Sequence, residues 1–119
     1  MAKILLVDDA AFMRAMLRQI LEKLGHEIVG EAVNGIEAVQ QYNKLKPELV
    51  TMDITMPEMD GIEAVKKICS QDKNAKIIMV SAMGQEGLVK QSIIYGAKDF
   101  VIKPFQSDRV QNSIDKVLA

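Results

Sequence analysis

The stretch Leu49–Gly61 (LVTMDITMPEMDG) decides the fold of this chain. It begins as a short apolar run that stops at one carboxylate, Asp53, and it continues into a turn-rich segment containing Pro57 and Gly61. An apolar run that ends in this way is typical of a buried parallel strand that delivers one acid to the edge of a sheet. The stretch therefore predicts an α/β protein with a chemical group at the end of a central strand.

Three further apolar runs end at polar residues in the same manner. Residues 3–7 are followed by Asp8 and Asp9, residues 77–80 by Ser81, and residues 100–102 by Lys103. Open α/β sheets hold their functional groups at the carboxyl ends of their strands. We therefore expect these side chains to share one edge of the sheet with Asp53.

Strand-like and helix-like segments alternate five times along the chain. Strands are expected near residues 3–7, 27–32, 49–52, 76–80 and 99–102. Helices are expected near residues 11–24, 35–45, 62–71 and 85–95, and from Ser107, a candidate N-cap, to the end. This alternation predicts a parallel sheet with helices on both faces.

Length, composition and charge exclude several classes of protein. The 119 residues predict one domain, 1–119, with no linker and no second domain. A hydrophobic fraction of 49% and the absence of a long apolar stretch favour a soluble, cytoplasmic protein without a membrane span. The formal net charge of −1 argues against an electrostatic nucleic-acid binder. The single cysteine, Cys69, excludes an internal disulfide.

The three acids Asp8, Asp9 and Asp53 predict a site for a divalent cation. Neighbouring ionised carboxylates repel, and without compensation some of their pKa values would rise. Mg²⁺ removes this repulsion, keeps several waters and bridges to phosphoryl oxygens. The chain has one histidine and no thiolate pair, so zinc is not expected. In the competing interpretation Asp8 and Asp9 merely cap the first helix, which explains neither Asp53 nor Lys103.

Lys103 and Ser81 supply the complementary groups. A lysine at this edge can pair with Asp53 when the site is empty and with a phosphoryl oxygen when it is filled. The hydroxyl of Ser81 can donate a hydrogen bond to another phosphoryl oxygen.

These motifs together resemble the response-regulator receiver domain over the whole chain. The resemblance rests on Asp8-Asp9, the segment 52–61, Ser81-Ala82 and Lys103-Pro104-Phe105, and the length is most similar to that of the family's single-domain chemotaxis regulators. It implies a flavodoxin-like, doubly wound fold with a five-stranded parallel sheet of order 2-1-3-4-5 and five helices.

The resemblance also implies a role for each site residue. Asp53 would be phosphorylated by a histidine kinase, Asp8, Asp9, Asp53 and the carbonyl of Thr55 would hold Mg²⁺, and Ser81 and Lys103 would bind phosphoryl oxygens. Ser81 and Phe100, which stands where many members have tyrosine, would form the switch.

The partners implied by the resemblance are the kinase CheA, the flagellar motor switch protein FliM and a phosphatase, with neither nucleic acid nor membrane. The chain would be a monomeric phosphoacceptor of chemotaxis signalling and not an enzyme.

Three other functions remain open on the sequence alone. The chain could be a stand-alone receiver of a phosphorelay outside chemotaxis. A magnesium-dependent phosphatase with an aspartyl nucleophile would need a second Asp as general acid where Thr55 stands, together with a cap domain. A flavodoxin would need a hydroxyl-rich phosphate loop after the first strand and stacking aromatics, yet Asp8 and Asp9 stand in that loop and aromatic residues make up 4%.

Overall fold

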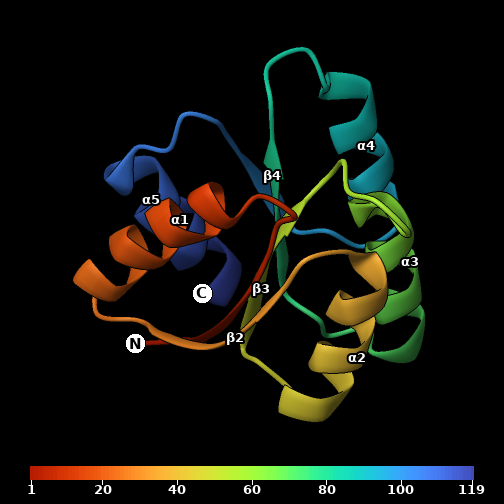
Figure 1. Ribbon diagram of the computed structural model, residues 1–119, viewed down its shortest axis with the longest axis horizontal. Helices are drawn as coiled ribbons and strands as arrows, with labels where there is room; N and C mark the ends of the chain where they lie inside the picture. The colour runs from red at the N-terminus through yellow and green to blue at the C-terminus, as the bar shows by residue number, and fades with distance from the viewer.

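The computed structural model describes residues 1–119 as five parallel strands alternating with five helices (Figure 1). The strands are β1 (Lys3–Val7), β2 (Glu27–Ala32), β3 (Leu49–Asp53), β4 (Ile77–Ser81) and β5 (Asp99–Ile102). The helices are α1 (Ala11–Lys23), α2 (Gly35–Leu45), α3 (Gly61–Gln71), α4 (Glu86–Ile94) and α5 (Ser107–Leu118). The strand order is β2-β1-β3-β4-β5, with every neighbouring pair parallel. The predicted doubly wound fold is confirmed.

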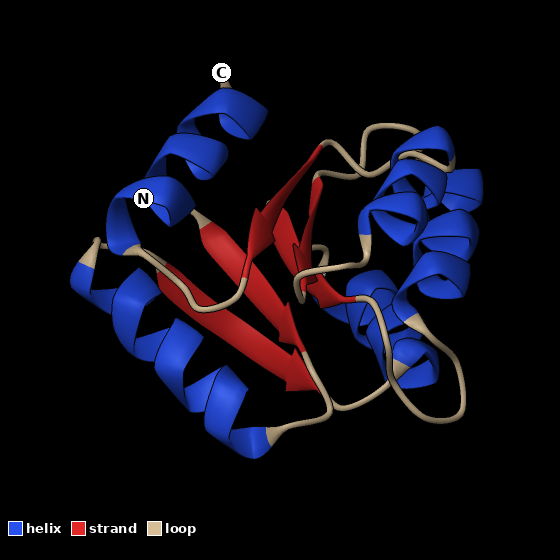
Figure 2. Cartoon of the chain, turned by 90° about the horizontal axis from the view of Figure 1, so that it is seen from above, coloured by secondary structure: helices blue, strands red, loops and turns tan.

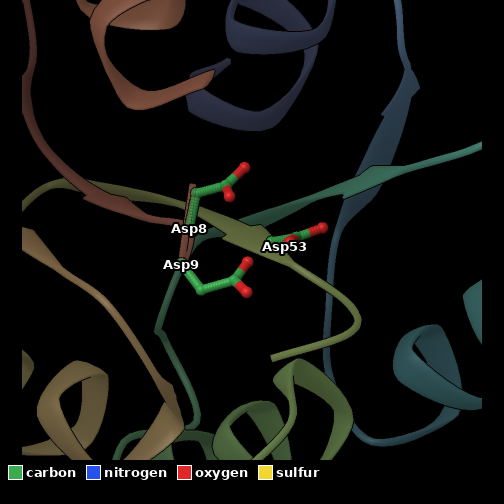
Figure 3. Close-up of side chains that lie close together, drawn as sticks. All are labelled: Asp8, Asp9 and Asp53. Carbon is green, nitrogen blue, oxygen red and sulfur yellow. The ribbon is translucent and has the colours of Figure 1, made fainter. Parts of the chain in front are cut away.

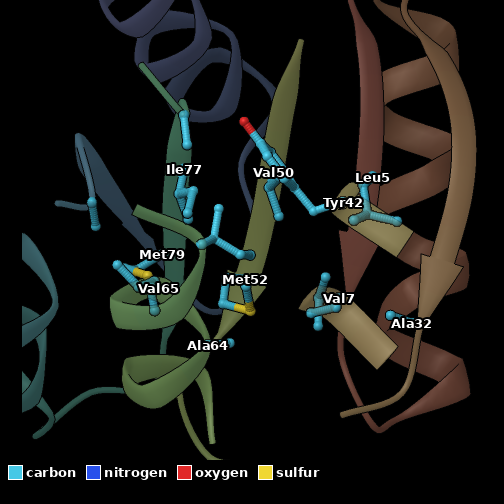
Figure 4. Packing of buried hydrophobic residues seen from close by; sticks show 14 of the residues in the cluster. Leu5, Val7, Ala32, Tyr42, Val50, Met52, Ala64, Val65, Ile77 and Met79 are labelled. Atoms are coloured by element: carbon cyan, nitrogen blue, oxygen red, sulfur yellow. The ribbon is translucent and has the colours of Figure 1, made fainter. Parts of the chain in front are cut away.

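The sheet separates two hydrophobic cores. Helices α1 and α5 cover one face, and α2, α3 and α4 cover the other (Figures 1 and 2). Successive strand residues point to opposite faces, so Leu5 and Val50 pack under α2 and α3 (Figure 4), whereas Ile4 and Leu49 pack under α1 and α5. Every residue of β3 and β4 is buried. The central strands are therefore packed on both faces, which fixes the positions of the backbone groups at their ends.

Two glycines let the loop after β3 fold back tightly onto the strand end. A Cβ on Gly61 would overlap the backbone carbonyl of Asp53, and the Gly61 N–H donates to the Ile54 carbonyl at 2.7 Å. The Gly35 N–H donates to the Met59 carbonyl at 2.8 Å, where a Cβ on Gly35 would also collide. These contacts fix the backbone that carries Asp53.

The structure corrects several predicted boundaries. Helix α3 begins at Gly61, β4 includes Ser81, and α4 is one residue shorter at each end than predicted. The prediction that Ser107 caps α5 is wrong, because Gln106 already has the extended backbone of an N-cap and makes no side-chain capping bond. No helix is both long enough and apolar enough to cross a bilayer.

Candidate functional site

The carboxylates of Asp8, Asp9 and Asp53 meet at the carboxyl ends of β1 and β3 (Figure 3). One oxygen of each lies within 4.8 Å of the others. The two strands are neighbours with Val7 opposite Met52, so the residues that follow in each strand lie side by side. Asp8 and Asp53 are each only 7% exposed, whereas Asp9 is open to solvent. The structure thus brings together the three acids that the sequence places at strand ends.

Lys103 reaches this cluster from the end of β5. Its ammonium nitrogen lies 3.4 Å from Asp53 Oδ1 and 3.6 Å from Asp8 Oδ2. β4 lies between β5 and β3, and the Lys103 N–H donates to the Ser81 carbonyl at 2.9 Å, so the side chain spans β4. The peptide bond between Lys103 and Pro104 is cis. This ammonium contacts two of the three carboxylates, and the cluster therefore keeps an excess of negative charge.

Burial, followed by the charge of Asp8, raises the pKa of Asp53 to about 6. The ammonium of Lys103 and the Ile54 N–H, which donates to Asp53 Oδ1 at 3.0 Å, oppose that rise without cancelling it. An ionised Asp53 is consequently costly when no cation is bound. A bound cation would remove that cost.

The donor set fits a hard divalent cation. The cluster contains only carboxylate oxygens, and Asp9 leaves it accessible to water. Mg²⁺ binds through few carboxylates and retains several waters, which matches a cluster that is buried on one side and open on the other. Thr55, the remaining predicted ligand, is exposed in the loop after β3, and its hydroxyl accepts a hydrogen bond from Gln85.

A network behind the cluster holds the turn that carries Asp8 and Asp9. Arg14 donates from one guanidinium nitrogen to the Asp8 carbonyl at 2.7 Å and from Nε to Glu31 at 2.7 Å. Asp8 Oδ1 accepts from the Ala10 N–H at 2.9 Å, just before α1. Local capping therefore accounts for one oxygen of Asp8 and for neither Asp9 nor Asp53. Sequence reasoning missed Arg14 and Glu31, because no local pattern links a helix residue to a distant strand.

Ser81 and Phe100 lie on the same side of the site as α4. Ser81 ends β4 one residue beyond Val80, the partner of Asp53, and it is 2% exposed. Phe100 is half-buried on β5, and both residues line a cavity of about 260 Å³ that α4 closes through Val89 and Ile93. Ser81 and Phe100 therefore border the same cavity, so a movement of either side chain can change the space available to the other.

Two further residues stand near the mouth of the site. Met83 is 81% exposed and makes the loop after β4 apolar. Gln85 accepts a hydrogen bond from the Ala82 N–H at 2.7 Å and donates one to the Thr55 hydroxyl at 3.1 Å. The sequence contains no signal for this bridge, because its ends lie 30 residues apart.

Comparisons with known proteins agree with this geometry. The family described as "Response regulator receiver domain" matches residues 4–115. The chain is 59% identical to the chemotaxis protein CheY of Thermotoga maritima over 115 residues, which covers 97% of this chain and 96% of that protein. It is 60% identical to the chemotaxis protein CheY of Bacillus subtilis over 116 residues, covering 98% and 97%. Among solved structures, one chain of the CheX–CheY–BeF3–Mg²⁺ complex from Borrelia burgdorferi is similar at a TM-score of 0.93 and 42% identity, covering 98% of this chain and 89% of that one.

Proposed function

The chain belongs to the response regulator receiver domain family, and from this premise we propose that residues 1–119 form a receiver that accepts a phosphoryl group on Asp53. The observation that carries the proposal is the buried Asp53 carboxylate, held between two further acids and the ammonium of Lys103. The similar chemotaxis proteins have nearly the same length, which supports a role in a chemotaxis phosphorelay with the kinase CheA as donor.

The reaction transfers a phosphoryl group from a phosphohistidine. An oxygen of Asp53 attacks phosphorus, the phosphorus–nitrogen bond breaks, the leaving imidazole takes a proton from solvent, and an acyl phosphate remains. Such transfers depend mainly on positioning and on neutralising the charge of the phosphoryl oxygens. Lys103 exchanges its contact with Asp53 for one with a phosphoryl oxygen, and the Ser81 hydroxyl donates to another.

Asp8, Asp9 and Asp53, with the Thr55 carbonyl, would hold Mg²⁺, which supplies positive charge to the phosphoryl oxygens. Arg14 keeps the Asp8 carbonyl in place while the carboxylates change partners.

The output of this receiver is a change of the surface formed by α4, β5 and α5. When Ser81 turns toward the phosphoryl group, it leaves room at the cavity of about 260 Å³ into which the Phe100 ring can move. The proposed reader of this surface is the motor switch protein FliM, and a phosphatase resets it. Phosphorylation strengthens binding only as far as the partner prefers the switched form.

Labelling with acetyl phosphate and Mg²⁺ tests the phosphoacceptor role. Intact-protein mass spectrometry should detect one added phosphoryl group that hydroxylamine removes. Asp53→Asn should abolish the label, and Glu58→Gln, an exposed acid of the same loop, should keep it. A label that survives in Asp53→Asn would refute the assignment. Continuous release of phosphate without a stable label would favour a phosphatase, and no reaction at all would favour a flavodoxin-like binding protein.

A further inference from the structure

The side chain of Gln85 joins the two loops that flank Asp53. Its oxygen accepts from the Ala82 N–H in the loop after β4, and its nitrogen donates to the Thr55 hydroxyl in the loop after β3. Gln85 also immediately precedes α4, where its carbonyl accepts from the Val89 N–H at 3.0 Å. One half-buried side chain therefore connects both loops with the start of the helix that closes the cavity beside Phe100.

The bond to Ala82 occupies a donor at the rim of the site. Ala82 follows Ser81 directly, and Ser81 follows the residue paired with Asp53 across the sheet. A tetrahedral anion on Asp53 needs several hydrogen-bond donors at this rim. Gln85 takes the Ala82 N–H away from such an anion. In addition, a backbone shift of Ser81 toward Asp53 would displace Ala82 as well, because the two residues share a peptide bond.

Support of α4 does not explain this arrangement. The Gln85 side chain makes no hydrogen bond to the free N–H groups of the first turn of α4. Its two bonds run backward, to Ala82 and to a loop from another strand. Loss of the side chain therefore removes no helix cap.

We propose that Gln85 is a positioning residue that holds the loop after β4 in the conformation described here, and that loading of Asp53 breaks both Gln85 hydrogen bonds. This inference rests on the phosphoacceptor function proposed above. Gln85 competes with the ligand for the Ala82 N–H and disfavours the movement of Ser81 and of the start of α4. These two hydrogen bonds thereby lower the affinity of the site for a phosphoryl group or its mimic.

Beryllofluoride titration at saturating Mg²⁺, followed by NMR, measures this competition. Gln85→Ala should bind beryllofluoride roughly five- to tenfold more tightly than wild type, because binding no longer breaks two hydrogen bonds that each have a modest net value. Gln91→Ala is the matched control, since Gln91 is an exposed glutamine within α4, and the affinity of this variant should equal that of wild type. Amide hydrogen exchange provides a second readout. The Ala82 N–H should exchange slowly in the empty wild type and faster in Gln85→Ala.

Each outcome decides the proposal. If Gln85→Ala binds beryllofluoride no more tightly than wild type does, the proposal for Gln85 is overturned. The phosphoacceptor function still stands in that case, provided that wild type binds beryllofluoride. Rapid exchange of the Ala82 N–H in the empty wild type also overturns the proposal for Gln85 and requires no variant. A wild type that fails to bind beryllofluoride overturns the phosphoacceptor function and this inference with it.

Discussion

Asp53→Asn should stabilise the metal-free protein at neutral pH. Asp53 is buried beside Asp8, and its pKa rises from 3.8 to about 6 on folding. Folding therefore favours the protonated carboxyl. The stability that protonation contributes is fully present below pH 3.8 and is lost as the pH rises through about 6. Asparagine has nearly the same shape and carries no charge at any pH.

The size of the effect follows from the pKa. A rise from 3.8 to about 6 costs the ionised protein about 3 kcal/mol at pH 7, because one pKa unit corresponds to roughly 1.4 kcal/mol. The variant loses the 3.4 Å contact with Lys103, whose ammonium keeps Asp8 as a partner. Because Lys103 already opposes the rise of this pKa, the loss of its contact is contained in that figure, and a gain of about 2–3 kcal/mol is expected.

Urea unfolding followed by circular dichroism in EDTA measures the gain, since the chain has no tryptophan. The difference between Asp53→Asn and wild type should be largest at pH 7 and should nearly vanish at pH 4. Glu58→Gln, which replaces an exposed acid outside the helices, controls for the change in net charge. A difference that is independent of pH, or a variant less stable than wild type at pH 7, would refute the electrostatic reasoning.

Three other changes test the remaining parts of the site. Asp9→Asn should weaken Mg²⁺ binding on the order of tenfold or more without lowering metal-free stability, since it removes one charge from a repulsive cluster; calorimetric titration that finds unchanged affinity contradicts the ligand role. Gly61→Ala should cost about 1–3 kcal/mol in urea unfolding because its Cβ would overlap the Asp53 carbonyl. Gly87→Ala, whose Cβ meets nothing within 4 Å in α4, should gain about 1 kcal/mol, and equal effects of the two changes would be evidence against the close contact. Ser81→Ala should still accept the phosphoryl group but gain little affinity for a motor-switch peptide from beryllofluoride, and a gain equal to that of wild type would show that the signal bypasses Ser81.

The sequence predicted the elements and the edge of the sheet that carries the acids. Apolar runs that stop at Asp53, at Asp8 or at Lys103 indicate where buried strands end. In a parallel sheet the carboxyl ends of all strands lie at the same edge. Periodicity alone did not supply the strand order, which came from the resemblance to a family. The N-cap of α5 was misplaced by one residue, because Ser107 has a side chain typical of N-caps whereas the extended backbone belongs to Gln106, and no periodic pattern encodes that angle.

Only the tertiary structure decided the electrostatics and the connections of the site. The raised pKa of Asp53 depends on how deeply the loop closed by Gly61 buries it, and the contact with Lys103 depends on a side chain that crosses β4. The bridge from Gln85 to Thr55 and the tie from Arg14 to Glu31 likewise join residues far apart in the chain. Local patterns fix which groups reach the edge of the sheet. The packing of the whole chain fixes the distances between those groups, and both their charge interactions and their hydrogen bonds depend on distance.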